Sequence, residues 1–420
     1  MVWVWRFAPT SNASNGGAPS FVSCGQFGSS RASDASELQN KQFVGCLGCA
    51  AKQRQMRPLL ARLTVALLLL VPPSVLGFGK MSSAPTVVAS SSRDAGLFIE
   101  TPLIPSSELT KLCNRPVYLK LDTLQASGSF KDRGMAHLCE TFKTQKGTKK
   151  LISSSGGNAG LACATVGPKL GMEVSVIVPE STKPIVVNKL KSLGADVTIH
   201  GKNWNAADEL ARKRVEEDAE AEYVSPYDHQ LLWTGHSTVV DEIVQQLPGV
   251  GNTPAMIIAS VGGGGLICGI LEGLERHNGM TSTVVAAETE GAASFGKSFV
   301  SGKKIRLESI DSIATSLGAL EVTDVALDRA RAHQAKGGVV KAAMCTDAEA
   351  VEACVRFAAD CRILVEPACG AALASLYSDR LRNDVLDGLG EGPIIVEVCG
   401  GSGVNIDLLS LWKKEYLEKE

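Results

Sequence analysis

Three glycine-rich segments constrain the fold of this chain most strongly, because each follows directly after a short run of apolar and β-branched residues. They are residues 153–160 (Ser-Ser-Ser-Gly-Gly-Asn-Ala-Gly), 261–265 (Val-Gly-Gly-Gly-Gly) and 399–403 (Cys-Gly-Gly-Ser-Gly). In a parallel sheet, the loops that leave the carboxyl ends of the strands surround the ligand site. Three such loops therefore predict one ligand-binding cleft at the edge of a sheet.

The pattern from about residue 97 onward fits such a sheet, because short β-branched runs alternate with helical patterns. We expect strands at 174–178, 195–199, 255–259, 283–287 and 393–398, and helices at 205–219 and 265–276. Alternating strands and helices imply right-handed crossovers and a mostly parallel sheet. The expected fold class is therefore α/β.

The four consecutive glycines Gly262, Gly263, Gly264 and Gly265 predict a phosphate-binding loop. Without side chains, consecutive amides can turn toward an anion, and the helix that follows adds the positive end of its dipole. A dinucleotide fingerprint does not fit, because neither register of the loop ends in glycine or alanine. We therefore expect the phosphate of a ligand smaller than a dinucleotide.

One lysine lies in an unusual setting upstream of these loops. Lys131 stands beside Phe130 in the segment 127–134 (Ser-Gly-Ser-Phe-Lys-Asp-Arg-Gly), at the entry to a helical pattern. Such a lysine is most often a solvated surface residue. Together with a phosphate loop, however, it fits a cofactor that carries an aldehyde, because a lysine amine can hold an aldehyde as a Schiff base.

The charge balance gives no support to a nucleic-acid partner, since the formal net charge is −2. A hydrophobic fraction of 45% and a charged fraction of 20% are typical of a globular enzyme. Basic residues are concentrated in the N-terminal part of the chain, where residues 1–80 hold eight Lys or Arg against two acidic residues. The first fifth of the chain is thus a different kind of sequence.

We expect residues 1–92 to be an N-terminal extension outside the catalytic region. The charge-free run at 63–79 lies at the short limit for a bilayer span, which makes a membrane anchor the least favoured interpretation. A segment that is disordered or dispensable before Met81, and a mitochondrial or secretory targeting signal, both stay open. The cysteines are scattered, with only Cys46 and Cys49 spaced like half of a redox or zinc motif, which favours a reducing, cytoplasmic compartment.

Five motifs occur together in one order: the Lys131 segment, the three glycine-rich segments and residues 366–373 (Glu-Pro-Ala-Cys-Gly-Ala-Ala-Leu). In this set the chain resembles the fold-type II pyridoxal-phosphate enzymes, most closely the animal L-serine dehydratases. The resemblance implies two open, mostly parallel sheets flanked by helices. It also implies a homodimer, and a catalytic region at 93–420 in which a small domain at about 126–232 is inserted between the two parts of a large domain, 93–125 and 233–420.

The resemblance also implies a cofactor, pyridoxal 5'-phosphate, and a role for each site residue. Lys131 would be the Schiff-base lysine, Phe130 would pack against one face of the cofactor, and the four glycines would bind its phosphate. Asn158 would contact the ring hydroxyl and Cys399 the ring nitrogen. The remaining assignments are Ser155, Gly156 and Asn158 for the substrate carboxylate, and Glu288, Ala292, Ser294 and Leu317 for a monovalent cation such as K⁺.

The activity implied by the resemblance is the deamination of a small amino acid, L-serine to pyruvate and ammonia and L-threonine to 2-oxobutanoate. The thiol of Cys399 is a weak partner for the ring nitrogen and favours elimination over β-replacement. A β-replacement enzyme of the cysteine or cystathionine synthase type remains the alternative, as does a weakly active dehydratase-like paralogue. Gly156 stands where related racemases carry a serine, which predicts weak racemisation.

Overall fold

The structure, a computed structural model, describes residues 90–249 and 253–418. Most of the extension predicted for 1–92 lies outside the described residues. This applies to the apolar run at 63–79, the pair Cys46 and Cys49, and the alternative start at Met81. The described residues begin with α2 (Ser90–Asp94).

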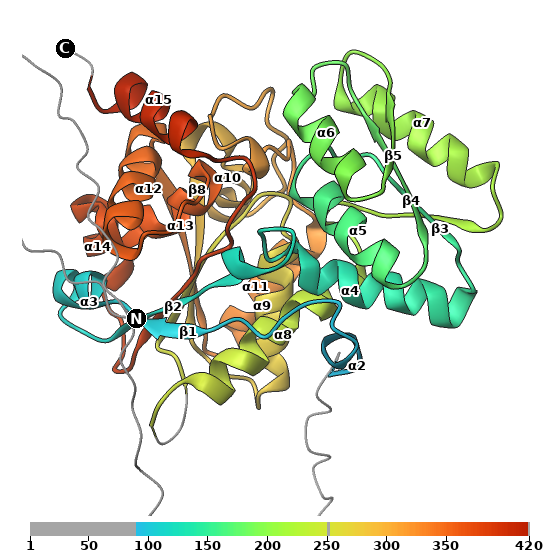
Figure 1. Ribbon diagram of the computed structural model, residues 1–420. Helices are drawn as coiled ribbons and strands as arrows, with labels where there is room; N and C mark the ends of the chain where they lie inside the picture. The colour runs from blue at the N-terminus through green and yellow to red at the C-terminus, as the bar shows by residue number, and fades with distance from the viewer. Residues whose placement is uncertain (1–89, 250–252, 419–420) are drawn as a thin grey trace, which may run out of the picture. The chain divides into compact units, whose positions relative to one another are not determined.

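The strands of the described residues form two separate sheets (Figure 1). The larger sheet has six strands in the order β1-β2-β10-β7-β8-β9, and the smaller has four in the order β5-β4-β3-β6. The strands of the larger sheet are β1 (Leu103–Pro105), β2 (Val117–Lys120), β7 (Met256–Ser260), β8 (Thr283–Thr289), β9 (Val339–Cys345) and β10 (Ile394–Glu397). Those of the smaller sheet are β3 (Lys150–Ser153), β4 (Glu173–Val178), β5 (Asp196–Ile199) and β6 (Ala221–Tyr223).

Helices connect these strands and cover the sheets. The α-helices after α2 are α3 (Ser107–Cys113), α4 (Lys131–Thr141), α5 (Asn158–Lys169), α6 (Pro184–Ser192), α7 (Trp204–Glu216), α8 (Gln230–Gln246), α9 (Gly265–Arg276), α10 (Ser294–Ser301), α11 (Asp324–Ala335), α12 (Asp347–Cys361), α13 (Pro367–Tyr377), α14 (Asp379–Leu386) and α15 (Ile406–Tyr416). Short 3-10 turns lie at η1 (Asp122–Leu124), η3 (Glu290–Ala292) and η4 (Thr315–Leu317), and the π-turn η2 (Phe142–Lys146) follows α4.

The larger sheet is parallel except at one edge, where β1 pairs with β2 in antiparallel orientation. Strand β10 lies between β2 and β7 and runs parallel to both. All seven residues of β8 are buried, as is usual for a central strand covered by helices on both faces. Helix α13 packs on β7 and β8, and α9 contacts β7.

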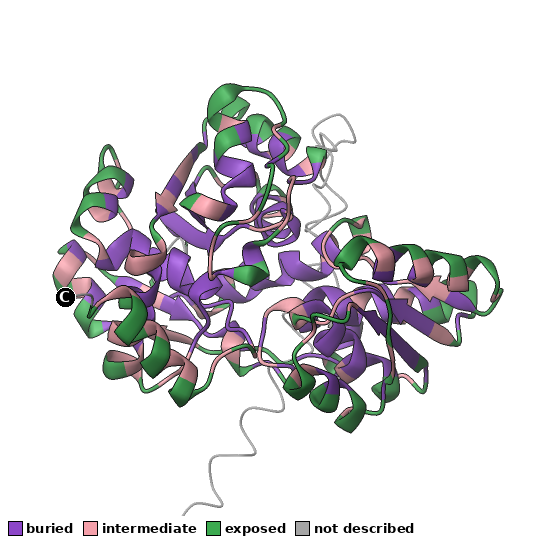
Figure 2. Cartoon of the chain, turned by 90° about the horizontal axis from the view of Figure 1, so that it is seen from above, coloured by how far each residue is buried: buried purple, intermediate pink, exposed green. Residues whose placement is uncertain are grey.

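The smaller sheet is covered by helices on both faces, because alternate residues of its strands join different apolar clusters. Ile152 and Ile177 pack with the alanines of α7, whereas their neighbours Leu151 and Val176 belong to the main core that includes α5. This is the period of two that places successive side chains on opposite faces of a strand. Figure 2 shows the resulting buried residues along the strands of both sheets.

Side-chain caps fix where several helices begin. The hydroxyl of Thr346 accepts a hydrogen bond from the Glu349 amide, and the Glu349 carboxylate in turn accepts one from the Thr346 amide, which forms a capping box at α12. Asn203 and Asn405 accept from backbone amides in the first turns of α7 and α15. Such caps satisfy amide groups that the helix itself leaves without partners.

The predicted α/β class with two mostly parallel sheets is confirmed, and so is every predicted strand and helix, with boundaries within a few residues. Strands β1, β2, β6 and β9 were not predicted. The insertion of a small domain at about 126–232 stays a prediction, although all strands of the smaller sheet fall inside that range. No helix of the described residues is long and apolar enough to cross a membrane.

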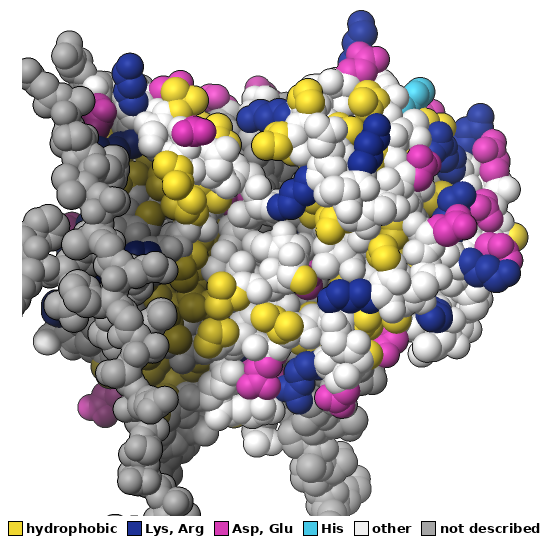
Figure 3. All heavy atoms as spheres, in the orientation of Figure 1, with side chains coloured by type: hydrophobic (Ala, Val, Ile, Leu, Met, Phe, Trp, Pro, Cys, Tyr) yellow, Lys and Arg dark blue, Asp and Glu magenta, His cyan; other side chains and the backbone are white. Residues whose placement is uncertain are grey.

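The surface of the part built on the smaller sheet carries both signs of charge. Figure 3 shows Lys and Arg side chains interspersed with Asp and Glu there. Many of these side chains form ion pairs at the surface, such as Lys146 with Glu222 at 2.6 Å. Exposed pairs of this kind contribute little to stability.

Candidate functional site

The backbone of the third glycine-rich segment holds Lys131 at the start of α4. Residues Ser129 and Gly400 form an isolated antiparallel bridge, and the amide of Phe130 donates to the carbonyl of Cys399 at 3.1 Å. Lys131 is the first residue of α4, as the sequence predicted for the entry to a helix. Two segments that lie far apart in the sequence thus fix the direction of one lysine side chain.

The amine of Lys131 is enclosed and lies above an aromatic ring. Its Nζ donates to the carbonyl of Pro226 at 2.8 Å and lies 4.9 Å from the centre of the Phe130 ring. The loss of water around the amine lowers its pKa to about 8, while the neighbouring Cys399 and Glu366 side chains act in the opposite direction. A lysine with such a pKa is partly neutral near pH 8 and can act as a nucleophile or a base.

The ring of His236 also contacts Phe130, with 4.9 Å between the ring centroids and a tilt of 57° between the ring planes. His236 is fully buried on α8, and burial holds its pKa well below the usual range. The ring lies against Gly134 so closely that a Cβ there would lie 2.4 Å from it. A neutral imidazole therefore supports the aromatic ring beneath the lysine.

The tetraglycine loop joins β7 to α9, and its shape requires glycine. Gly264 has φ +96°, and a Cβ there would lie 2.9 Å from the Cβ of Ala326. A Cβ on Gly263 would lie 2.3 Å from ring atoms of Tyr227. The loop is thus a cradle of bare backbone at the N-terminus of a helix, where anions bind.

The first glycine-rich segment makes a tight turn between β3 and α5. The amide of Gly157 donates to the hydroxyl of Ser155 at 3.3 Å. A Cβ on Gly160 would lie 1.8 Å from the carbonyl oxygen of Ser155, so this position also requires glycine. Gly156 faces Val178 and Thr182, whose methyl groups would lie 3.2 and 3.3 Å from a Cβ there.

Asn158, at the end of this turn, links it to the third glycine-rich segment. Its Nδ2 donates to Glu366 Oε1 at 2.8 Å, and its Oδ1 accepts from both the amide and the hydroxyl of Ser402 at 3.1 Å. Its Nδ2 also lies 3.4 Å from the hydroxyl of Ser316. The next residue, Leu317, packs on Gly262 of the second glycine-rich segment. The amide side chain therefore connects all three glycine-rich segments.

Cys399 follows β10 and is buried beside the end of β7. Its Sγ lies 3.7 Å from the hydroxyl of Ser260, which itself donates to the carbonyl of Ala368 at 2.7 Å. A hydrogen bond with the Cys369 thiol and burial raise the pKa of Cys399 well above its usual range. Cys399 is thus a neutral thiol, and its contact with the ring nitrogen of the cofactor stays a prediction.

The residues predicted for a monovalent cation lie at two places around β8. Glu288 is fully buried, and its two carboxylate oxygens accept from the amides of Phe295 and Gly296 at 2.9 and 2.6 Å. Ser294 is buried next to them, and its hydroxyl has no hydrogen-bond partner in the described part of the chain. Leu317 lies against Gly262. Burial raises the pKa of Glu288 to about 8.

The same segment contains a motif that sequence reading missed. Residues 291–298 (Gly-Ala-Ala-Ser-Phe-Gly-Lys-Ser) match the spacing of a nucleotide phosphate loop between a strand and a helix. The structure does not support that function, because Glu288 already occupies the amides of Phe295 and Gly296 with its own carboxylate. In addition, a Cβ at Gly291 would lie 1.7 Å from the carbonyl oxygen of Asp311, so the backbone there is packed against protein.

Three residues of the site had no role in the sequence prediction: Tyr227, Ser402 and Glu366. Tyr227 covers the tetraglycine loop and is fixed by Trp233, whose indole donates to the Tyr227 carbonyl at 2.8 Å. Glu366 carried a signal in the sequence, because Glu is not among the residues that usually precede the first turn of a helix.

Among the described residues, no group of three or more His, Cys, Asp or Glu side chains is placed to hold a metal ion.

The glycine cradle, the enclosed lysine and the neutral thiol together suit a phosphorylated aldehyde. Comparison with known protein families matches residues 95–400 to the family described as "Pyridoxal-phosphate dependent enzyme". The chain belongs to this family. Within this family of pyridoxal-phosphate dependent enzymes, Lys131 is the amine that could bond to the cofactor's aldehyde, and residues 262–265 could hold its phosphate.

Relatives of this pyridoxal-phosphate dependent enzyme cover most of its length. The chain is 38% identical over 324 residues to the L-serine dehydratase/L-threonine deaminase of Bos taurus, covering 76% of this chain and 96% of that protein. It is 40% identical over 308 residues to the serine dehydratase-like protein of Mus musculus, covering 73% and 91%. A fungal L-serine ammonia-lyase from Rhizomucor miehei superimposes with a TM-score of 0.70 at 35% identity, covering 76% and 99%.

Proposed function

We propose that this enzyme deaminates L-serine to pyruvate and ammonia, and L-threonine to 2-oxobutanoate, by eliminating the β-hydroxyl group. The observation that carries this proposal is an enclosed lysine amine and a buried neutral thiol on two segments joined by the hydrogen bond from the Phe130 amide to the Cys399 carbonyl, together with a cradle of glycine backbone. The relatives named as serine or threonine deaminases match over almost their full length, which supports the same substrate class.

Each residue of the site would have its own role in this elimination. When bound, the cofactor draws electrons from the α-carbon of the amino acid joined to its aldehyde. The amine of Lys131, once free and neutral, takes the α-proton at Nζ, and Phe130 supports the stacked ring. The amides of 262–265 hold the phosphate, and those near Ser155 and Gly156, with Asn158, hold the substrate carboxylate.

Cys399 decides which chemistry is favoured. A neutral thiol leaves the ring nitrogen of the cofactor largely unprotonated, which makes the ring a modest electron sink and suits elimination. By the family resemblance, position 156 would face Lys131 across the cofactor, and as a glycine it has no side chain that could return a proton from that face. Val178 and Thr182 lie beside it. We therefore infer that racemisation is weak.

A monovalent cation forms a second part of the proposal. We assign Glu288, Ala292, Ser294 and Leu317 to a K⁺ ion, because oxygen atoms are the ligands of hard cations. The buried hydroxyl of Ser294, which lacks a partner among the described residues, supports this assignment. The ion would stabilise the loops next to Gly262.

The assembly and the compartment are also proposals. We propose a homodimer, as the family resemblance implies, and a reducing cytoplasmic compartment, which the nine unpaired cysteines of the described residues support. Size-exclusion chromatography with light scattering tests the first proposal. Fractionation of cells that express the full-length chain tests the second.

The function is tested with the full chain loaded with pyridoxal 5'-phosphate. We expect a visible absorbance band, and release of 2-oxo acid and ammonia in equal amounts when L-serine is added. Lys131→Ala should lose both the band and the activity, whereas the exposed Lys149→Ala should keep both. A band without 2-oxo acid, together with product formation when a thiol or sulfide is added, would instead establish a β-replacement enzyme.

A further inference from the structure

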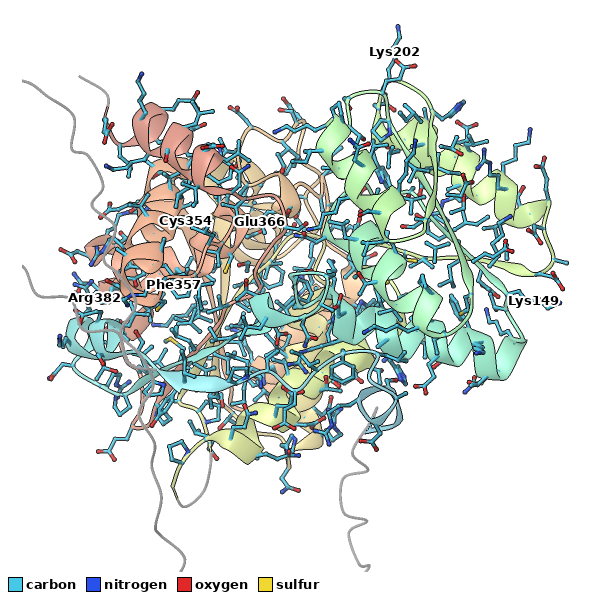
Figure 4. All side chains as sticks on the ribbon, in the orientation of Figure 1. Lys149, Lys202, Cys354, Phe357, Glu366 and Arg382 are labelled. Carbon is cyan, nitrogen blue, oxygen red and sulfur yellow. The ribbon has the colours of Figure 1, made fainter. Side chains whose placement is uncertain are left out.

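The carboxylate of Glu366 is buried in the site, although a side chain at the residue before a helix is normally placed to cap that helix. Glu366 is the residue before α13, with Pro367 in the first turn, yet its side chain makes no capping hydrogen bond to that helix. It is 6% exposed. Figure 4 shows Glu366 in the interior of the described structure, far from the surface lysines Lys149 and Lys202. A buried carboxylate is costly unless its oxygens have partners.

Two partners of Glu366 come from glycine-rich segments, and a third is the side chain of Ser316. Its Oε1 accepts from Asn158 Nδ2 at 2.8 Å, and its Oε2 lies 3.4 Å from the amide of Gly403. Gly401, with φ +126°, passes so close that a Cβ there would lie 1.9 Å from the carboxyl carbon. The third glycine-rich segment is therefore wrapped around this carboxylate, which explains why it requires glycine at 401.

These contacts leave only one orientation for the Asn158 amide. The backbone amide of Ser402 can only donate, so the Asn158 atom that faces it must be the oxygen, and Nδ2 must face Glu366. One of the two Nδ2 hydrogens is taken by Glu366. The other faces the hydroxyl of Ser316 at 3.4 Å, which is long for a hydrogen bond and leaves this hydrogen available to a ligand.

The charge of Glu366 also acts on Lys131. The groups whose charges bear on that amine are Cys399 at the end of β10, Glu366 before α13 and His236 on α8. Cys399 and His236 are neutral, because burial disfavours the charged form of each. Burial raises the pKa of Glu366 as well, but its hydrogen bonds with Ser316 and Asn158 and the charge of Lys131 act in the opposite direction and favour the carboxylate.

We propose that Glu366 is a positioning residue of the cofactor site: it holds Asn158 with one amide hydrogen directed at the ring oxygen of the cofactor, and its carboxylate stabilises the protonated amine of Lys131. The inference rests on the cofactor site of the proposed function. It does not depend on which amino acid the enzyme converts.

Two substitutions separate the two roles. Glu366→Ala removes both the acceptor for Asn158 and the charge. Glu366→Gln keeps an oxygen that can accept from Asn158 and removes only the charge. Glu349→Gln is the control for a carboxylate outside the site, where Glu349 pairs with Arg380.

The experiment titrates the apo form of each full-length variant with pyridoxal 5'-phosphate and records the absorbance band as a function of pH. We expect Glu366→Ala to raise the dissociation constant about tenfold or more, since a hydrogen bond to a charged group is lost. Glu349→Gln should stay within about threefold. In Glu366→Gln the midpoint of the band should move to lower pH, because the protonated amine loses its opposite charge.

The proposal is wrong if Glu366→Ala binds the cofactor as tightly as the unmodified chain, or if Glu366→Gln leaves the pH midpoint in place. Circular dichroism shows whether Glu366→Ala is folded, and if it is not, the pH midpoint of Glu366→Gln decides alone. These outcomes are distinguishable from a failure of the proposed function, in which the unmodified chain shows the absorbance band but forms no 2-oxo acid.

Discussion

The amine of Lys131 donates a hydrogen bond of 2.8 Å to the backbone carbonyl of Pro226. A carbonyl oxygen can hold an ammonium group without neutralising it, so this contact fixes the position of the amine while burial makes its charge costly. Pro226 is followed by Tyr227, which covers the tetraglycine loop. One short segment thus sets the spacing between the amine and the phosphate cradle.

The first prediction concerns the pH at which Lys131 reacts. Because burial lowers its pKa from 10.5 to about 8, the amine is protonated and unreactive below pH 8 and becomes neutral above it. We expect the yield of cofactor bonded to Lys131 and trapped by borohydride after short exposure to rise with pH, with a midpoint near 8. Mass spectrometry of the peptide measures this yield. A midpoint near 10 would show that the amine is solvated.

The second prediction concerns the glycine cradle. Gly264→Ala places a side chain at φ +96°, and Gly263→Ala places one against the Tyr227 ring. Each should lower the free energy of unfolding by about 1–2 kcal/mol and weaken cofactor binding. Urea denaturation and cofactor titration measure the two effects. Gly390→Ala, where a Cβ meets nothing within 4 Å, is the control.

A double substitution makes this second prediction sharper. If the Tyr227 ring is what excludes a side chain at 263, then Tyr227→Ala combined with Gly263→Ala should bind the cofactor better than Gly263→Ala alone. Equal binding by the single and double variants would place the cause in the loop backbone instead.

The third prediction concerns the buried ion cluster next to the lysine. Arg133 binds Asp122 through two hydrogen bonds of 2.7 Å and Glu242 through bonds of 2.6 and 2.7 Å, and all three side chains are buried. Replacing Arg133 with methionine leaves two carboxylates that Lys120 alone cannot balance. We expect a loss of about 3–5 kcal/mol in the free energy of unfolding.

Denaturant unfolding of Arg133→Met measures this loss. Glu108→Ala provides the comparison, because it breaks an exposed pair with Lys111 and should cost about 0.5 kcal/mol or less. A similar small cost for Arg133→Met would mean that the cluster does not hold α4 in place.

The fourth prediction concerns the cation. Replacing K⁺ by Li⁺ in the buffer should lower the thermal stability of the loaded enzyme, since an ion that binds the folded state stabilises it by about 1–3 kcal/mol at concentrations well above its dissociation constant. Ser294→Ala should reduce this response, because it removes one of the assigned oxygen ligands. Identical melting curves in the two salts would contradict the assignment.

The sequence predicted the fold class and the elements that carry the site because local patterns determine them. The β-branched runs before Gly262 and Cys399 became β7 and β10, and the helical pattern after Gly265 became α9. Strand β9 (Val339–Cys345) escaped prediction, because its side chains are buried in an irregular pattern that follows no simple alternation. It lies at the edge of the larger sheet, where one neighbour is absent.

Contacts between distant segments could not be read from the sequence. The role of Glu366 depends on the path of residues 399–403, and the cover of the tetraglycine loop depends on where Tyr227 lies after β6. At 291–298, by contrast, the sequence matches a phosphate loop that the structure does not support. The amides of Phe295 and Gly296 donate to the carboxylate of Glu288, a residue that the sequence pattern does not include.

The position of β10 has a consequence for how the chain is made. This strand lies in the middle of the larger sheet, between β2 and β7, yet it is the last strand along the part of the chain that the structure describes. Until residue 397 has left the ribosome, β2 and β7 each present an open edge, and the backbone that orients Lys131 through Phe130 and Cys399 does not yet exist. The nascent chain therefore has its phosphate cradle before it has the backbone that orients the amine of Lys131.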